Sequence, residues 1–387
     1  MAELSVNKPR IQSIDLLRGS IMVIMALDHV RDFFYHSPGF EPTDIDKTNV
    51  ILFFTRWITH FCAPLFMFLS GTSAFIMGQK KTKSELSVFL LTRGLWLIFL
   101  ELTIFAFAWT QQISLYSHGL LVIWALGISM IFLAIMIWLP LEVILVVGLV
   151  LVFGHNLLDN THVEGNNISS LLWKMFHEQG QVQVGKFQIW VMYPIVPWIG
   201  VMMLGYCLGK LYTGSIDAAA RKKFLLMAGS LITVLFIVLR YSNWYGDSNL
   251  WASRPETSHT ILSFLNTSKY PPSLLYLCMT IGPGMVILAF TENANGWFSN
   301  IIKVFGRVPM FYYICHLYLI HIGAIVLFFA QGYTLADMDK GIPPDYGVNL
   351  FWTYMVWLGI VFILYFPCRW YDKYKSAHKE NKWLSYL

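Results

Sequence analysis

Long apolar segments, separated by short polar connections, run along almost the whole chain. A helix needs about 20 apolar residues to cross the hydrocarbon core of a bilayer, and the sequence predicts about ten such helices. They lie near residues 13–35, 49–78, 86–109, 119–139, 141–158, 189–212, 223–241, 271–291, 303–330 and 349–368. We therefore expect an all-α, polytopic integral membrane protein with a single domain over residues 1–387. Its helical core at 13–368 follows an N-terminal segment, 1–12, and precedes a basic tail, 369–387.

Composition and charge agree with this architecture. Of the 387 residues, 56% are hydrophobic and only 13% are charged, with a mean hydropathy of +0.57, whereas soluble domains carry about 25% charged residues. If the N-terminus is cytoplasmic, fifteen Lys and Arg residues fall inside and six outside, as the positive-inside rule requires. The inside set is Lys8, Arg10, Lys80, Lys81, Lys83, Lys210, Arg221, Lys222, Lys223, Lys303, Arg369, Lys373, Lys375, Lys379 and Lys382; the outside set is Lys47, Lys174, Lys186, Arg254, Lys269 and Lys340. Both termini are therefore predicted to be cytoplasmic, and the net charge of +5 gives no reason to expect a nucleic-acid partner.

The first predicted helix, which contains IDLLRGSIMVIMALDHVRDFF, carries several ionisable residues although it is long enough to cross a bilayer. Arg18 and His29 are 11 residues apart, so both project from one face, about 16 Å apart along the axis. Asp15 lies three residues before Arg18, and Asp28 three before Arg31, a spacing that brings side chains together on a helix. Ionisable groups at membrane depth are costly and usually face a cavity or pathway.

A structural explanation also exists for these charges. Arg18 would extend to the inner interface and residues 28–32 would lie at the outer headgroups, which leaves 19–27 as the buried part. That stretch is far too short to span a bilayer. Polar residues on other helices favour a shared polar interior instead: Arg56, His60, Arg93, Glu101, Arg307, His316 and His321. The five cysteines lack metal-type spacing, so no metal site is expected. The segment from Lys269 to Ser273 begins a predicted span from the outside; we expect an interfacial anchor with prolines at the helix start, and the alternative is a segment that shapes the acceptor mouth.

Several motifs resemble known membrane acyltransferases. Arg18, ten intervening residues and His29 are similar to the signature of the acyltransferase family three type, and PLFMFLSGTSAF (64–75) resembles its second-helix motif. The series RIQSIDLLRG, PLFMFLSG, TRGLWLIFLE and FGRVPMFYYICHLYLIH resembles the catalytic domain of the heparan-α-glucosaminide N-acetyltransferase family and its bacterial relatives. The resemblance covers nearly the whole chain and is most specific in the first 110 residues.

This resemblance implies transfer of an acetyl group from cytoplasmic acetyl-CoA, used as a co-substrate, to an amine or hydroxyl of a sugar or glycan across the membrane. Imidazole suits the required base because its pKa is close to working pH. We expect His29 to act as base or acyl carrier with Asp28 as its orienting partner. The likeness of FFYHSPGF to the lysosomal enzyme points instead to His36, and the family has a late histidine where His316 falls.

The CoA phosphates require cations at the cytoplasmic mouth. Arg18, Arg93 and Lys80 are expected to supply them, with Asp15 as the ion-pair partner of Arg18. No counterpart of the large luminal domain of the human enzyme is evident, so heparan sulfate itself is not the expected acceptor. The sequence leaves open N- or O-acetylation and whether the protein is a homo-oligomer.

Two other classes of protein remain open. Buried carboxylates and histidines also form proton relays, so a proton-coupled secondary transporter of a small polar solute is the main alternative. Against it, the sequence shows no convincing internal repeat, and its ionisable residues concentrate in the first three predicted helices. A scaffold without catalysis would need no aligned Arg18 and His29. We expect an enzyme of a bacterial inner membrane in contact with lipid.

Overall fold

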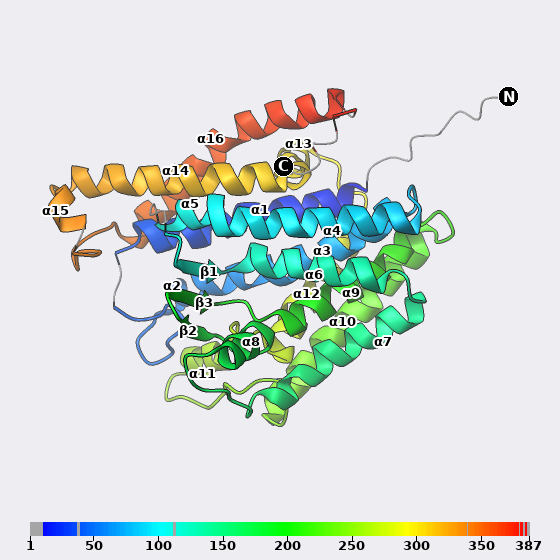
Figure 1. Cartoon of the computed structure of the whole chain (residues 1–387), viewed down its shortest axis with the longest axis horizontal. Coiled ribbons are helices and arrows are strands. Elements are labelled where there is room, and N and C mark those ends of the chain that lie inside the picture. Colours follow the sequence, from blue (N-terminus) through cyan, green and yellow to red (C-terminus); the bar gives the residue numbers. More distant parts are fainter. Residues whose placement is uncertain are drawn as a thin grey trace.

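The computed structural model consists mainly of long helices that run side by side (Figure 1). It describes residues 11–36, 39–110, 114–338, 340–378, 380, 381 and 384. Most of the predicted N-terminal segment, including Lys8 and Arg10, lies outside the described residues, as do Lys379 and Lys382 of the tail. Each predicted apolar segment overlaps an observed helix.

Seven helical segments are long and apolar enough to cross a membrane. They are Val50–Gly78, Lys83–Thr110, Leu141–Leu158, Ile195–Tyr212, Ala218–Ser242, Pro309–Ala330 and Leu350–Ala377. Two further apolar helices, α6 (Val122–Met136) and α12 (Leu274–Phe290), are shorter. Helix α1 (Gln12–Phe34) has 23 residues but includes five charged side chains. The chain is thus an integral membrane protein with a helical core.

Several of these segments are composite. Val50–Gly78 contains α2 (Val50–Trp57), the 3-10 turn η1 (Ile58–Phe61) and α3 (Cys62–Gly78). Lys83–Thr110 contains α4 (Lys83–Leu100), the π-turn η2 (Glu101–Phe105) and α5 (Ala106–Thr110). The remaining long helices are α7 (Leu141–Gly154) with η3 (His155–Leu158), α9 (Ile195–Leu208) with η4 (Gly209–Tyr212), α10 (Ala218–Ser242), α14 (Pro309–Ala330) and α16 (Leu350–Ala377).

Polar side chains determine where many helices begin. The side chain of Asn49 accepts from the backbone N–H of Leu52 at the start of α2. Thr82 and Glu85 form a reciprocal capping box at the start of α4. Such caps satisfy N–H groups that have no partner inside the helix. Asp217, Ser273 and Asn349 do the same for α10, α12 and α16.

The predicted segment 303–330 is not one helix. It divides into α13 (Trp297–Arg307) and α14, and Val308 between them has non-helical dihedrals of φ −129° and ψ 50°. Pro309 occupies the first turn of α14, where its missing N–H costs no hydrogen bond, but the residue before a proline is disfavoured in the helical conformation. The proline therefore ends one helix and begins the next.

A small sheet, which the apolar pattern did not predict, lies at one end of the bundle. Strands β2 (Gly180–Val184) and β3 (Phe187–Val191) form an antiparallel hairpin, and β1 (Ser117–Leu120) pairs in parallel with β3. The short helices α8 (Ile168–Phe176), α11 (Thr257–Leu265) and α15 (Leu335–Met338) lie toward this same end, on the left in Figure 1. We call it the sheet end; α1 runs toward it from the opposite end.

Glycine pairs lie at the five most extensive helix contacts among the described residues. Gly19 of α1 faces Gly306 of α13: a Cβ on Gly306 would lie 1.9 Å from the carbonyl oxygen of Asp15, and one on Gly19 would lie 2.0 Å from that of Ile302. The other pairs are Gly71 and Gly205 (α3 and α9), Gly94 and Gly127 (α4 and α6), Gly148 and Gly200 (α7 and α9), and Gly229 and Gly282 (α10 and α12). Small residues allow helix backbones to pack closely in lipid, where apolar burial alone does not drive helices together.

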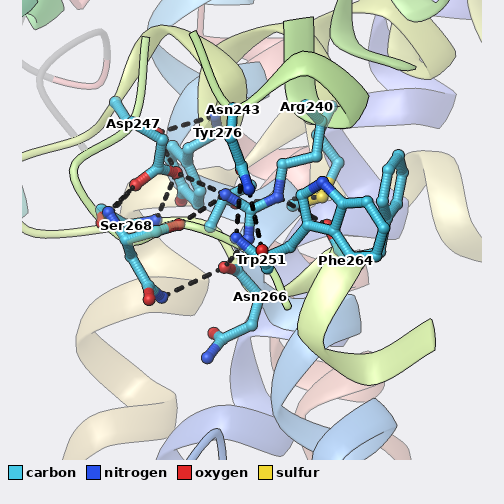
Figure 2. A network of polar contacts seen from close by, with 12 residues as sticks. Arg240, Asn243, Asp247, Trp251, Phe264, Asn266, Ser268 and Tyr276 are labelled. Atoms are coloured by element: carbon cyan, nitrogen blue, oxygen red, sulfur yellow. Dashed lines mark hydrogen bonds and ion pairs between the residues drawn. The ribbon is translucent and has the colours of Figure 1, made fainter. Parts of the chain in front are cut away.

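A network around Arg240 orders the loop between α10 and α12. The Arg240 side chain is 1% exposed. Its guanidinium donates to four carbonyl oxygens, those of Asn249, Ser263, Phe264 and Asn266, at 2.6–2.9 Å (Figure 2). Because all four acceptors belong to residues 249–266, one buried cation holds the two halves of this loop together.

Asp247 extends the same network toward α12. It lies 3.8 Å from Arg240 and accepts from the backbone N–H of Ser268 at 3.0 Å and from its hydroxyl at 2.7 Å (Figure 2). It also accepts from the hydroxyl of Ser273, the N-cap of α12, at 2.8 Å. The network therefore holds both ends of the segment 268–273, which leads into the candidate site.

We predict that Gly306→Ala destabilises the protein by at least about 1–3 kcal/mol, the usual cost of overpacking, because its Cβ would overlap the backbone of α1. The matched control is Gly359→Ala in the interior of α16, where a Cβ meets no atom within 4 Å. There, alanine should be neutral or stabilising by up to about 1 kcal/mol. Thermal unfolding in detergent measures both; equal midpoints would contradict the importance of the α1–α13 contact.

We predict that Arg240→Met lowers stability by about 3–5 kcal/mol, because it leaves Asp247 buried without its cation. Arg254→Met is the control: Arg254 pairs with Asp46 at 2.8 Å but is 36% exposed, and surface pairs contribute about 0–1 kcal/mol. Thermal unfolding compares the two variants, and hydrogen exchange at the Ser268 amide reports local opening. A Ser268 amide as protected in Arg240→Met as in the wild type would contradict the proposed role of this network.

Candidate active site

Asp28 is the centre of a buried group of charges at the sheet end of α1. Arg56 of α2 donates a very short hydrogen bond to Asp28 Oδ2, and Arg31 Nη1 lies 2.9 Å from Oδ1. Lys269 Nζ, from the loop before α12, lies 3.9 Å from Oδ2. A buried carboxylate requires partners of opposite charge, and here they come from α1 itself, from α2 and from the loop before α12. We call Asp28, Arg31, Arg56 and Lys269 the Asp28 cluster.

His29, next in sequence, forms a hydrogen bond with a second histidine. Its Nδ1 lies 2.7 Å from Nε2 of His316 on α14, and the two rings stack with centroids 5.0 Å apart. The Nδ1 of His316 lies 3.0 Å from the carbonyl oxygen of Tyr312. Because a carbonyl oxygen can only accept, His316 carries its proton on Nδ1, and with both rings neutral its Nε2 accepts from His29. The Nε2 of His29 is then unprotonated, as a general base requires.

Aromatic side chains surround the histidine pair. The Trp109 ring of α5 meets the His29 ring edge-on at 5.0 Å, and Tyr313 approaches it at 6.1 Å. Tyr312 stacks on His316 at 5.2 Å with nearly parallel rings. These apolar faces limit the access of water and orient the imidazoles. Sequence reasoning missed Trp109 and Tyr313, because an aromatic residue within an apolar segment is common and carries no distinguishing signal.

Two tyrosines extend the site toward the sheet. The hydroxyls of Tyr270 and Tyr193 are 3.4 Å apart, and Tyr193 follows β3 directly. Burial raises the pKa of Tyr270, but the nearby charges of Lys269 and Arg56 outweigh it and lower that pKa below its usual value. Burial raises the pKa of Tyr193 well above its usual value. Tyr270 is therefore the more acidic of the two phenols.

The structure places Lys269 differently from the expected interfacial anchor. Its side chain is 10% exposed and points to Asp28, whereas an anchoring lysine extends its ammonium into water. The carboxylate of Asp28 contacts the cations of Arg31 and Arg56, and the Nδ1 of His29 donates to His316. The orienting role of Asp28 toward His29 stays a prediction.

His36 lies in different surroundings from His29. It is exposed, its backbone N–H donates to the carbonyl of Val348, and its Nδ1 lies 3.2 Å from the carbonyl oxygen of Tyr346. It lines a cavity of about 380 Å³ together with Tyr35 and residues 347–350. The two candidate histidines, seven residues apart, therefore face a buried charge cluster and an open cavity, respectively.

Arg18 lies toward the opposite end of α1, about 16 Å along the axis from His29. It donates to the Ser73 hydroxyl of α3 at 2.6 Å and to the carbonyl of Gly306 at 3.3 Å. Asp15 lies 3.7 Å from Arg18, as predicted from their spacing, and 3.8 Å from Arg307. Arg18 thus lies beside the glycine pair that joins α1 to α13.

The other predicted donor-binding residues lie on α4 and before it. The guanidinium of Arg93 lies above the Phe89 ring at 5.9 Å. Lys80 is exposed in the turn between α3 and α4.

Comparison with known proteins identifies the family. A family model described as "Heparan-alpha-glucosaminide N-acetyltransferase, catalytic" matches residues 10–243. The matched region includes Arg18, Asp28, His29, His36 and Arg56, whereas Lys269 and His316 follow it. No curated protein is significantly similar to the chain in sequence. Because the model matches more than half of the chain, this protein belongs to the heparan-α-glucosaminide N-acetyltransferase catalytic-domain family.

Proposed function

We propose that the protein transfers an acetyl group from cytoplasmic acetyl-CoA to an amine or hydroxyl of a sugar or glycan on the other side of the membrane. The family is one of membrane-embedded acyltransferases of the acetyltransferase kind. The observation that carries the proposal is the hydrogen bond between His29 and His316, which leaves one nitrogen of His29 available as a base.

The topology we propose has ten transmembrane passes with both termini in the cytoplasm. The passes are α1, α2–α3, α4–α5, α6, α7, α9, α10, α12, α14 and α16. In this arrangement the sheet end faces away from the cytoplasm, and the Arg18 end of α1 faces it. The excess of Lys and Arg in the cytoplasmic connections supports this orientation. We place the protein in a bacterial inner membrane.

At the cytoplasmic end, Arg18 and Arg307 supply positive charge for the CoA phosphates, together with Arg93 of α4 and Lys80 in the turn before it. Arginine binds phosphate through several N–H donors held in a fixed plane. Asp15 holds the two arginines on adjacent helices, at 3.7 and 3.8 Å. The extended pantetheine arm then follows α1 toward His29. The length of α1 between Arg18 and His29, about 16 Å, suits such a path.

At the sheet end, His29 Nε2 takes the proton of the acceptor amine or hydroxyl as it attacks the thioester carbonyl. His316 positions His29 through the Nδ1 hydrogen bond and stabilises the imidazolium that forms. Asp28 holds Arg31, Arg56 and Lys269 around the reacting groups and lowers the cost of charge on His29. In a covalent variant of this route, His29 carries the acetyl group before the acceptor attacks; ping-pong kinetics distinguish this variant from direct transfer.

We expect acetyl-CoA and CoA to raise the thermal stability of the purified protein, since a ligand that binds only the folded state stabilises it by about 2.7 kcal/mol at 100 times its Kd. ATP and a small acetylated thiol serve as ligand controls. Arg18→Ala should raise the ligand concentration needed for the same stabilisation by about 10- to 150-fold, because a hydrogen bond to a charged group contributes about 1.5–3 kcal/mol. Arg254→Ala, at the sheet end, should leave it unchanged. A folded wild-type protein that neither ligand stabilises would favour transport of a polar solute instead.

We expect His29→Ala to reduce release of CoA from acetyl-CoA, with glucosamine as acceptor, by about 10²–10⁴-fold, the usual contribution of a general base. Donor binding should stay intact, because His29 lies far from Arg18. His316→Ala should cause a smaller loss, and His36→Ala should leave the rate within about threefold. An inactive His36→Ala beside an active His29→Ala would assign the base to His36.

A further inference from the structure

The ammonium group of Lys269 is buried but has no hydrogen-bond acceptor among the described residues. Its ammonium is 3.9 Å from Asp28, beyond hydrogen-bond distance, and 5.2 Å from the centre of the Tyr270 ring. Among the described residues it donates no hydrogen bond to an oxygen or nitrogen. A buried ammonium has three N–H donors, and leaving them without acceptors is costly. Tyr270 satisfies the charge only through its ring face.

The charge balance around Lys269 is also incomplete. Asp28 is already paired with Arg31 and Arg56, and Arg31 also contacts Asp32 at 2.5 Å. The ion pairs of this network therefore join three cations to two carboxylates. An uncompensated buried charge is destabilising by several kcal/mol. A ligand group that brings or develops negative charge would complete the network at Lys269.

Acyl transfer develops such a charge at every turnover. When the acceptor nitrogen or oxygen bonds to the thioester carbon, the electron pair of the C=O π bond moves to the carbonyl oxygen. The pair then returns as the C–S bond breaks and CoA leaves as a thiolate. The proton of the acceptor passes to His29 Nε2 and from there to the thiolate, so the products are the acetylated acceptor and CoA. The transient negative oxygen is the group that preorganised donors stabilise most.

We propose that Lys269 is a catalytic residue whose ammonium donates to the thioester carbonyl oxygen and stabilises the oxyanion. This role rests on the acetyltransferase function proposed above. Lys269 Nζ lies 3.9 Å from the carboxylate of Asp28, the residue that precedes His29 in α1, so the ammonium lies on the same side of the site as the base. In this mechanism Lys269 stabilises the negative charge on the thioester oxygen, and His29 removes the proton of the acceptor.

The loop that carries Lys269 is fixed on both sides. Before it, both polar groups of Ser268 bind Asp247, which lies beside Arg240 (Figure 2). After it, the carbonyl oxygen of Pro272 faces His155 Nε2 at 2.8 Å, and Ser273 binds Asp247 at 2.8 Å. A donor held in place before the reaction costs no reorganisation when charge develops. The Arg240 network therefore positions Lys269 as well as ordering the loop.

Isotope-edited infrared spectroscopy of ¹³C-carbonyl acetyl-CoA tests this role without any acceptor. Bound to the full-length wild-type protein, the carbonyl band should lie at lower frequency than in free acetyl-CoA, because hydrogen bonding weakens the C=O bond. Lys269→Met should abolish that shift while the Kd for acetyl-CoA changes less than about threefold. The matched control, Lys340→Met, removes a lysine that is 74% exposed and paired with Asp337, and it should keep the shift. Where turnover is measured as CoA release, Lys269→Met should lower it about 10²–10³-fold, as loss of one such donor does.

Conservative variants separate this role from a structural one. Lys269→Arg keeps the charge and should retain part of the shift, and Lys269→Gln keeps an N–H donor without charge and should retain less. They also replace Lys269→Met if that variant fails to fold. A wild-type carbonyl band at the free frequency, or one that all three variants leave unchanged, overturns the role of Lys269 alone. Failure of the folded wild-type protein to bind acetyl-CoA overturns the proposed function itself.

Discussion

Close backbone packing at glycine pairs is the constraint on which the structure depends. Helices in lipid gain little from burying apolar side chains against one another, so their contacts rely on van der Waals packing and polar interactions. Gly19 and Gly306 bring α1 and α13 so close that a methyl group on either would overlap the facing backbone. Four further glycine pairs join α3, α4, α6, α7, α9, α10 and α12 in the same way.

The polar interior follows from this packing. Arg18 reaches both Ser73 and the Gly306 carbonyl because α1, α3 and α13 meet closely at that point. At the other end of α1, Asp28 would be too costly to bury alone, and it receives cations from its own helix, from α2 and from the loop before α12. The Arg240 network fixes that loop through Asp247, which lies beside Arg240 and accepts hydrogen bonds from Ser268 and Ser273 (Figure 2). Packing and electrostatics therefore depend on each other: close helices create the interior, and paired charges make it stable.

This arrangement divides the proposed chemistry between the two ends of one helix. Cations beside the glycine pair suit a polyanionic donor, and the histidine pair in its aromatic surroundings suits proton transfer away from water. The intervening stretch of α1 is uncharged and, apart from Ser20, contains no polar side chain. A continuous helix keeps the two ends at a fixed separation, so a donor held by its phosphates at one end presents its thioester at a defined depth. Positioning of this kind lowers the entropy cost of the reaction.

Local sequence determined much of this protein. Apolar segment length predicted the helices to within a few residues over most of the chain, since a bilayer-spanning helix needs about 20 apolar residues. Helical spacing predicted the pairing of Asp15 with Arg18 and of Asp28 with Arg31. The motifs of the first 110 residues indicated the family that the comparison then identified. The break at Val308 and the small sheet escaped prediction, because one proline and strands of four or five residues contribute little to an apolar pattern.

Only the tertiary structure decided which of the candidate residues lie close together. His29 and His316 are 287 residues apart, and no local spacing shows that α1 and α14 bring them to hydrogen-bond distance. The sequence could not separate His29 from His36, because the two resemblances point to different histidines. Packing buries His29 within α1, whereas His36 lies beyond the end of that helix and is exposed. Lys269 looked like an interfacial residue until the loop before α12 was seen to turn it toward Asp28. Contacts between distant segments depend on how helices pack, and the periodicity of apolar residues along the chain does not determine which helices become neighbours.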